Sequence, residues 1–210
     1  MIKHTSMKHG WYYFYRIHTQ KALNLLNNKD FISLNNYLEE MYNSCPHNLF
    51  TIGPRSSSLN FNLSIDQTEI KNHETSILAS QALSNMDNYK TNHSKVEVYM
   101  LERDNKTIAV EVPIWLNHDE LKLFNKLFST EEPLSGHIDI LRIEDNKIWI
   151  WDYKPKAHKE KYAHVQTLFY AIMLSKRTGI DLKHFKCGYF DEYTSYVFNP
   201  CYSLLNLIKC

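Results

Sequence analysis

The stretch Gly136-His137-Ile138-Asp139 and the stretch Trp151-Asp152-Tyr153-Lys154-Pro155 decide the fold of this chain. Between them lies Glu144-Asp145-Asn146-Lys147, a turn signal that joins two runs rich in β-branched residues. This pattern predicts an antiparallel β-hairpin of about residues 136–143 and 148–154. In such a hairpin Asp139 lies opposite or diagonal to Asp152.

Strand alternation places Asp152 and Lys154 on one face of the second strand, while the tryptophans and Tyr153 lie on the other. Two carboxylates as close as Asp139 and Asp152 resist joint ionisation unless a cation lies between them, and their oxygens suit Mg²⁺ or Mn²⁺. An Asp-x-Lys pair also occurs by chance on solvated hairpins. Here, however, it ends an Ile-Trp-Ile-Trp run, where charged groups are costly to bury unless they bind something. Gly136 further indicates close approach by another segment or by a ligand.

Downstream of the hairpin, Gln166-Thr167-Leu168-Phe169-Tyr170 adds a Gln-x-x-x-Tyr motif. The Gly-x-x-Asp, Asp-x-Lys and Gln-x-x-x-Tyr motifs, in this order, resemble the PD-(D/E)XK nuclease superfamily, and within it the RecB-like branch that includes CRISPR-associated exonucleases. The resemblance covers about residues 73–190. It implies an α/β fold with a restriction-endonuclease-like core, in which helices flank a mixed central β-sheet, here with an N-terminal helical elaboration.

The resemblance also implies a divalent-metal-dependent nuclease that hydrolyses phosphodiester bonds of DNA. Asp139, Asp152 and the main-chain carbonyl of Tyr153 would hold one or two Mg²⁺ or Mn²⁺ ions. Lys154 would orient the attacking water or stabilise the pentavalent phosphorane.

A further metal ligand is expected from the helix that precedes these strands. His73 is the preferred candidate, because histidine is the RecB-like choice, and Glu74 is the other. Glu111, in a Val-Glu-Val-Pro strand, would support the site by contacting these ligands rather than the metal.

Gln166 and Tyr170 are four residues apart and so share one face of a predicted helix. They would hold the DNA backbone and orient Lys154, although ordinary helix packing explains a tyrosine here as well. A basic cluster that follows the Asp-x-Lys motif would contact DNA phosphates, which makes binding salt-dependent: Lys156, Lys159 and Lys161.

Length and composition agree with one main domain. The chain has 210 residues and is 43% hydrophobic, which is ordinary for a globular protein. We expect an N-terminal helical region and loop over residues 1–62 and the nuclease core over residues 63–210. The formal net charge of +1 means that attraction to DNA depends on local clusters of lysine. No apolar run approaches the length of a membrane span, and a signal-peptide core is missing, so an intracellular protein is expected.

The remaining elements follow from apolar periodicity and turn residues. Helices are expected over about residues 11–26, 33–42, 66–86, 119–128 and 159–176. A loop is expected over residues 45–62. A further hairpin is expected from strands at 95–102 and 107–115, and two closing strands at 183–190 and 195–198.

The four cysteines and the histidines indicate no additional metal centre in the sequence. Some RecB-like relatives carry an iron–sulfur cluster, but the cysteines here are too widely spaced for one, so reduced thiols are expected: Cys45, Cys187, Cys201 and Cys210. His4, His9 and His18 have no zinc-type spacing, and most of the histidines are expected at the surface. The aromatic run 11–15 is expected mainly in the core, with base stacking as the alternative.

Two other functional classes stay open at this point. One is a catalytically silent protein of the nuclease fold that binds nucleic acid or a partner protein. The other is an interaction module that binds no metal, in which the acidic hairpin is a coincidence.

Overall fold

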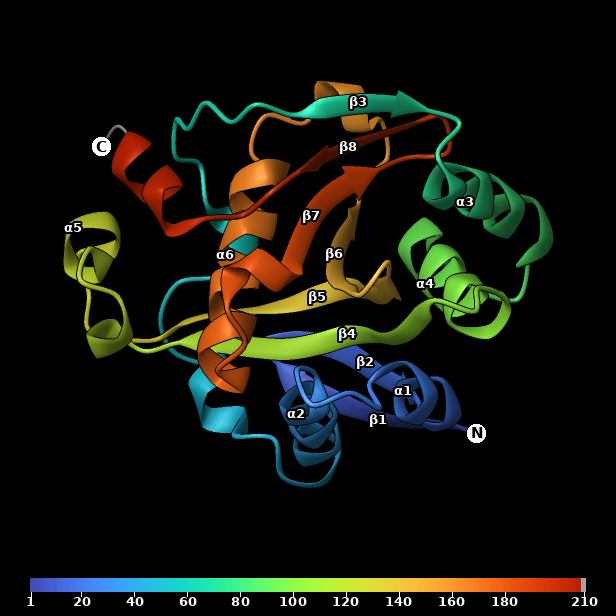
Figure 1. Cartoon of the computed structure of the whole chain (residues 1–210), viewed down its shortest axis with the longest axis horizontal. Coiled ribbons are helices and arrows are strands. Elements are labelled where there is room, and N and C mark those ends of the chain that lie inside the picture. The colour runs from blue at the N-terminus through green and yellow to red at the C-terminus, as the bar shows by residue number, and fades with distance from the viewer. Residues whose placement is uncertain (209–210) are drawn as a thin grey trace.

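The computed structural model describes residues 1–208, and within them eight strands form one sheet in the order β1-β2-β4-β5-β6-β7-β8-β3 (Figure 1). The strands are β1 (Ile2–His9), β2 (Trp11–His18), β3 (Thr68–Lys71), β4 (Thr107–Leu116), β5 (Leu134–Glu144), β6 (Lys147–Tyr153), β7 (Phe185–Phe190) and β8 (Thr194–Phe198). Neighbouring strands in this described sheet are antiparallel except β6 and β7, which are parallel. The result is the mixed α/β architecture expected from the sequence.

Helices cover both faces of the sheet. The α-helices are α1 (Thr19–Leu25), α2 (Ile32–Ser44), α3 (Glu74–Asn85), α4 (Asn92–Arg103), α5 (Phe124–Phe128) and α6 (Ala163–Thr178). The larger core cluster lies between the sheet and α1, α2 and α6, whereas α3 and α4 pack over a smaller cluster that contains Trp151 and Tyr153. In Figure 1, α6 runs in front of the sheet, and α3 and α4 lie together at its right-hand side.

The central hairpin of β5 and β6 confirms the prediction from the sequence. Asp145 and Asn146 have φ values of 50° and 55°, as the two central residues of a type I′ turn require. The paired register ends with Ile140 opposite Trp151, and Asp139 and Asp152 are the next residues of the two strands beyond this last pair. The alternation of faces also holds, because Ile148 and Ile150 join the larger core cluster whereas Trp151 joins the smaller one.

The N-terminal region begins with a β-hairpin, so the helix expected over residues 11–26 is wrong for residues 11–18, whereas Thr19–Leu25 form α1. Residues 2–18 form β1 and β2, and β2 pairs with β4 in the main sheet. Aromatic residues favour strands, and the aromatic run alternates as a strand does, with Tyr13 half-buried and Tyr15 buried on one face and Tyr12 and Phe14 exposed on the other. The N-terminal elaboration is therefore mixed, with α1 and α2 following a hairpin, and the division of the chain near residue 62 stays a prediction.

The strand expected over residues 95–102 is also wrong, because these residues form α4. Thr91 caps this helix: its hydroxyl oxygen accepts a hydrogen bond from the backbone N–H of Ser94 at 3.1 Å. Val96 and Met100, one turn apart, are fully buried on its inner face. The apparent alternation in Val-Glu-Val-Tyr was the misleading signal.

Other boundaries shifted by a few residues. The helix expected over 66–86 is divided into β3 and α3, since Asn72 turns the chain at φ 54° between them. The helix expected over 119–128 is a 3₁₀ turn followed by the short α5. The helix expected over 159–176 begins later, at Ala163, and ends at Gly179, which adopts the left-handed conformation at φ 73°. In the described residues no helix is both long and apolar enough to cross a membrane.

Candidate active site

The two aspartates of the hairpin meet where β5 and β6 stop pairing. Asp139 is 9% exposed and Asp152 is fully buried. Asp139 Oδ2 accepts a hydrogen bond from the backbone N–H of Tyr153 at 3.0 Å, in place of a main-chain acceptor. Lys154 Nζ lies 2.6 Å from Asp152 Oδ2, so the lysine points toward the acidic pair.

Burial raises the pKa values of both aspartates, and repulsion between the two carboxylates raises that of Asp152 further. Desolvation, followed by the charge of Asp139, raises the pKa of Asp152 to about 7. Desolvation also raises the pKa of Asp139. Burial lowers the pKa of Lys154, but the charges of Asp152 and Asp139 outweigh it and the pKa rises overall, so the lysine stays an ammonium at neutral pH.

A second acidic pair lies beside the first. Desolvation, then the charge of Asp139, raises the pKa of Glu111 to about 8. Desolvation and the charge of Glu111 raise that of Glu97 well above its ordinary value. Glu111 has a φ of 52°, a left-handed conformation that is costly for a glutamate and found at sites where it serves a purpose.

This acidic group has the donors that a hard divalent cation requires. Among the described residues, Asp152 Oδ1 and Glu97 Oε1 are buried without a hydrogen-bond partner, and Lys154 alone pairs with Asp152 Oδ2. Buried carboxylate oxygens with no partner are costly in free energy. A cation held between Asp139 and Asp152 would satisfy the unpartnered oxygen of Asp152, so the aspartates fit Mg²⁺ or Mn²⁺.

His93, in the first turn of α4, is the histidine that reaches the acidic pair. Its Nε2 lies 3.8 Å from Asp139 Oδ2, and its ring packs edge-on against Tyr153 at 5.1 Å between centroids. Glu97 follows one helical turn later on the same face. Sequence reasoning missed both residues, because it assigned residues 95–102, including Glu97, to a strand and expected no helix that contains His93. The available signal was a His-x-x-x-Glu pair just after the N-cap Thr91.

His73 and Glu74 make their contacts elsewhere, so the structure does not bring them to the aspartates. His73 caps α3 by accepting a hydrogen bond from the N–H of Thr75 at 3.2 Å, and its ring packs on Trp151 at 5.2 Å. Trp151 faces the opposite side of β6 from Asp152. Glu74 Oε2 pairs with Arg142 at 2.6 Å, inside a structural ion network. The structure therefore does not support either one as the helical ligand, and His93 is the helical histidine that lies near Asp139.

A small pocket opens beside the aspartates. Its volume is about 200 Å³, and its lining combines Asp139, Lys154 and Glu111 with residues from β2, β5, α6 and the loop after α2. Gln166 and Tyr170 line it from α6, where the amide of Gln166 donates to the Tyr170 hydroxyl at 2.6 Å. Both residues thus lie where the sequence placed them.

The close approach expected at Gly136 is confirmed. A Cβ atom there would overlap the side chain of Ser56 and lie 2.7 Å from Tyr170 Cε1. Ser56 belongs to the loop over residues 45–62, which also sends Arg55 into the pocket. Sequence reasoning treated this loop as a connection and missed its part in the site, because nothing local marks a loop that packs against a distant strand.

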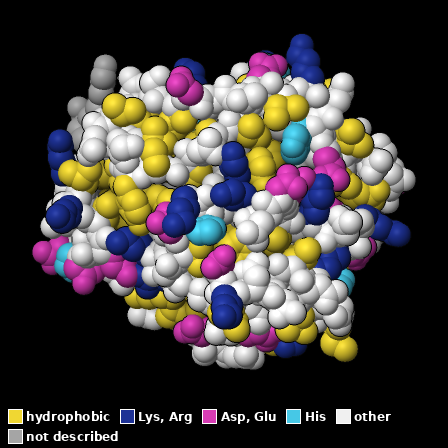
Figure 2. All heavy atoms as spheres, in the orientation of Figure 1, with side chains coloured by type: hydrophobic (Ala, Val, Ile, Leu, Met, Phe, Trp, Pro, Cys, Tyr) yellow, Lys and Arg dark blue, Asp and Glu magenta, His cyan; other side chains and the backbone are white. Residues whose placement is uncertain are grey.

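The three lysines after the Asp-x-Lys motif are exposed: Lys156, Lys159 and Lys161. They surround the 3₁₀ turn Ala157–Lys159, and Lys156 has a left-handed φ of 66°. On the face drawn in Figure 2, the Lys and Arg side chains are scattered among acidic and apolar ones and form no continuous basic surface.

The cysteines and histidines differ in how deeply they are buried. Cys187 is buried and Cys201 exposed, whereas Cys210 lies outside the described residues. His9 is only 2% exposed, so it is an exception to the surface position expected for most of the histidines.

Comparison with known proteins identifies one family. The model of a family described as the PD-(D/E)XK nuclease superfamily matches residues 65–194, which is more than half of the chain. No curated protein and no solved structure matches the chain.

Proposed function

Because the chain belongs to the PD-(D/E)XK nuclease superfamily, we propose that it is a divalent-metal-dependent deoxyribonuclease that hydrolyses phosphodiester bonds at the pocket beside Asp139 and Asp152. We place it in the RecB-like branch. The motifs at Gly136, Asp139, Gln166 and Tyr170 support this, and so does a histidine, His93, as the helical residue near the acidic pair.

One observation carries the proposal. Asp152 is fully buried with Oδ1 unpartnered, while an ammonium group, Lys154 Nζ, lies 2.6 Å from its other oxygen. A purely structural ion pair would leave no carboxylate oxygen unpaired in the interior, since such an atom costs about 1–3 kcal/mol. Sites that bind and transform a ligand retain costs of this kind.

Asp139, Asp152 and His93 would hold the cation, with the Tyr153 carbonyl as a further donor and Glu111 close by. When bound, a divalent cation supplies a Lewis acid for the phosphate and lowers the pKa of a bound water. Lys154 is charged at neutral pH, so it can donate hydrogen bonds to the attacking water or to the phosphorane oxygens as negative charge develops there.

Gln166 and Tyr170 fix the wall of the pocket that Lys154 faces. Their mutual hydrogen bond of 2.6 Å and their burial restrict both side chains to one arrangement. The Tyr170 ring packs directly on Gly136, so it also holds β5 at a defined distance from α6. We assign both residues to positioning Lys154 and the phosphate backbone.

The size of the pocket supports a polymeric substrate. Sites for whole small molecules usually enclose about 300–1,000 Å³, whereas this one holds about 200 Å³. That volume suits a single phosphodiester group whose flanking nucleotides lie outside. The exposed Lys156, Lys159 and Lys161 lie beyond Lys154 along the chain, in a position to contact neighbouring phosphates.

The deciding experiment is cleavage of single- and double-stranded DNA, with RNA of the same sequence for comparison, in Mn²⁺ or Mg²⁺. We expect the parent to cleave DNA and Lys154→Ala to lose activity by about 10²–10³-fold, the effect of removing one transition-state donor. Lys122→Ala, at an exposed lysine outside the pocket, is the matched control and should cleave as the parent does. Equal rates for parent and Lys154→Ala would refute the assigned chemistry.

A catalytically silent protein of the same fold is the competing interpretation. It predicts DNA or protein binding without cleavage, and no binding of Mn²⁺ that depends on Asp139 and Asp152. Titration calorimetry of the parent and of Asp152→Asn with Mn²⁺ separates the two interpretations.

A further inference from the structure

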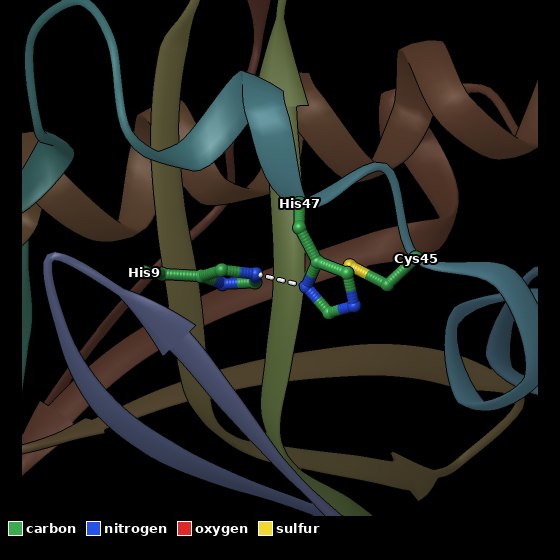
Figure 3. Close-up of side chains that lie close together, drawn as sticks. All are labelled: His9, Cys45 and His47. Atoms are coloured by element: carbon green, nitrogen blue, oxygen red, sulfur yellow. Dashed lines mark hydrogen bonds between the residues drawn. The ribbon is translucent and has the colours of Figure 1, made fainter.

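A second group of metal-binding side chains lies outside the acidic site, at His9, Cys45 and His47 (Figure 3). His9 ends β1, Cys45 follows α2, and His47 begins the next 3₁₀ helix, His47–Phe50. One ligand atom from each lies within 4.8 Å of the others. His9 is buried, Cys45 is half-buried and His47 is exposed, so the group extends from the interior to the surface.

We propose that His9, Cys45 and His47 form a binding site for a zinc-class transition-metal ion. Two imidazoles and the Cys45 thiolate, whose proton is released to solvent when the ion binds, make a nitrogen and sulfur donor set that suits Zn²⁺ or Co²⁺ and is a poor match for Mg²⁺. Three protein ligands leave one tetrahedral position open, on the side where His47 meets solvent. The proposal does not depend on the nuclease assignment.

His9, the most buried of the three proposed ligands, has a second-nitrogen contact of the kind that orients metal-binding histidines. His9 Nδ1 lies 2.8 Å from Nε2 of the buried His137, and the His9 ring stacks on Phe50 with centroids 4.1 Å apart. A hydrogen bond on one ring nitrogen fixes the ring and directs the other nitrogen toward the ion. That other nitrogen, His9 Nε2, faces His47 Nδ1 at 2.8 Å.

A small adjustment accommodates the ion. Two nitrogens at about 2.0–2.1 Å from a tetrahedral centre are roughly 3.3 Å apart, so the 2.8 Å separation of the two rings must open by about half an ångström. His47 can move by this amount, because it is exposed and begins a short helix. Figure 3 shows the Cys45 sulfur beside the His47 ring, where it can join the same centre.

The direction of the hydrogen bonds links this site to the pocket. Arg55 only donates hydrogen bonds, so its contact of 3.2 Å with His137 Nδ1 makes that nitrogen an acceptor. His137 Nε2 then carries the proton and donates to His9 Nδ1, and His9 Nε2 donates to His47. Without metal, the proton on His9 therefore occupies the nitrogen that an ion would take.

Binding at His9 Nε2 reverses this order. The His9 proton moves to Nδ1 and donates to His137 Nε2, so the proton of His137 moves to Nδ1, facing the guanidinium of Arg55. One N–H of Arg55 then loses its acceptor and can donate to another one in the pocket that Arg55 lines, while its contacts with Phe50 O and the Tyr13 hydroxyl remain. Occupancy of the metal site thus changes the hydrogen-bonding partner of a cationic side chain next to Asp139 and Lys154.

Cobalt titration of the full chain tests the site itself. We expect one equivalent of Co²⁺ to give the intense visible bands of tetrahedral coordination and a thiolate charge-transfer band, and Zn²⁺ to displace it. Cys45→Ser should lose the charge-transfer band, and His47→Ala should bind Co²⁺ at least tenfold more weakly. Cys201→Ser, at the exposed cysteine, is the matched control and should behave as the parent does.

Several outcomes would overturn the site. The first is the absence of a thiolate band in the parent. The second is a binding stoichiometry well below one Co²⁺ per chain. The third is a Co²⁺ titration of Cys45→Ser that equals that of the parent. Circular dichroism of metal-free Cys45→Ser and parent should coincide, which shows that loss of the band is not loss of the fold. Asp152→Asn should keep the cobalt spectrum, so failure of the nuclease proposal leaves this test intact.

The coupling between the metal site and Arg55 is tested by comparing the Co²⁺ affinities of two Arg55 variants. Arg55→Gln supplies a side chain that can accept a hydrogen bond from His137, whereas Arg55→Lys can only donate, as arginine does. We expect Arg55→Gln to bind Co²⁺ several-fold more tightly than Arg55→Lys. Equal affinities would refute the coupling.

Discussion

The acidic site at the end of β5 and β6 and the cluster of His9, Cys45 and His47 are built in opposite ways. The aspartates come from one hairpin, so strand alternation and a two-residue turn place them together. The cluster combines the end of β1 with a segment after α2, and no local pattern relates these segments. A site within one supersecondary unit can be recognised in sequence, whereas a site between units forms only when the chain packs.

The two sites also differ in donor chemistry, yet one loop serves both. Oxygen donors dominate the first and nitrogen and sulfur donors the second, so the two should select different metals. The loop over residues 45–62 begins with Cys45 and His47 and continues to Arg55 and Ser56 in the pocket. Each of the following predictions separates the two sites or tests this connection.

The largest expected effect is the pH dependence of the acidic site above pH 6.5. Below that pH the buried His9 and His137, whose pKa values are lowered by burial, make stability rise with pH and oppose it. The folded pKa of Asp152 is about 7 and that of Glu111 about 8, against ordinary values of 3.8 and 4.5. Between the ordinary and the folded pKa of each group the unfolded chain has released the proton while the folded chain keeps it, so stability falls as pH rises toward about 7 for Asp152 and about 8 for Glu111. We expect metal-free protein to lose stability on the order of a few kcal/mol between pH 6.5 and 8.

Thermal unfolding in EDTA at several pH values measures this effect. Asp152→Asn should flatten the dependence, and Mn²⁺ should stabilise the parent most at high pH, where no proton has to be displaced. A metal-free parent that becomes more stable toward pH 8 would contradict the assigned burial of these carboxyl groups.

Gly136→Ala tests the contact between the shared loop and the acidic site. The new Cβ would overlap Ser56 and crowd Tyr170, so we expect a loss of about 1–3 kcal/mol in the free energy of unfolding, as in overpacked cores. Denaturant unfolding measures it. Gly10→Ala is the control for space, because a Cβ there meets nothing within 4 Å, although its positive φ adds backbone strain. Equal or better stability for Gly136→Ala would show that the loop packs elsewhere.

His93→Ala and His73→Ala distinguish the two helical histidines. Removing His93 should weaken Mn²⁺ binding by about 10–100-fold, if the loss resembles that of other groups that support a metal. His73→Ala should leave Mn²⁺ affinity unchanged and cost about 1 kcal/mol of stability through the lost N-cap. Calorimetry of both variants decides, and the reverse pattern would restore the assignment made from the sequence.

The smallest effect is expected from the exposed lysines. Replacing Lys156, Lys159 and Lys161 with alanine should weaken DNA binding and lower the magnitude of the salt slope by up to about three, since each lost phosphate contact removes roughly one. Binding of Asp152→Asn to DNA at increasing salt concentration avoids cleavage during the measurement. An unchanged slope would place the DNA path on another face.

Several elements of the fold were predictable because their signals are local. The hairpin of β5 and β6 has both alternation and a turn signal, and α6 has a long apolar pattern that ends at Gly179. The segments at β2 and α4 were misread, because aromatic and β-branched runs fit either period. Partners decided these cases: β2 pairs with β4, and α4 buries Val96 and Met100 against the sheet.

By itself, the sequence determined the acidic pair, its lysine and the Gln-x-x-x-Tyr helix, because backbone periodicity places residues within one element or one hairpin. Only the tertiary structure decided that His93 rather than His73 faces Asp139, that Arg55 and Ser56 line the pocket, and that His9 meets Cys45 and His47. These contacts join segments far apart in the chain. Their geometry depends on how faces pack to bury apolar surface, and that is a property of the whole fold rather than of any short stretch.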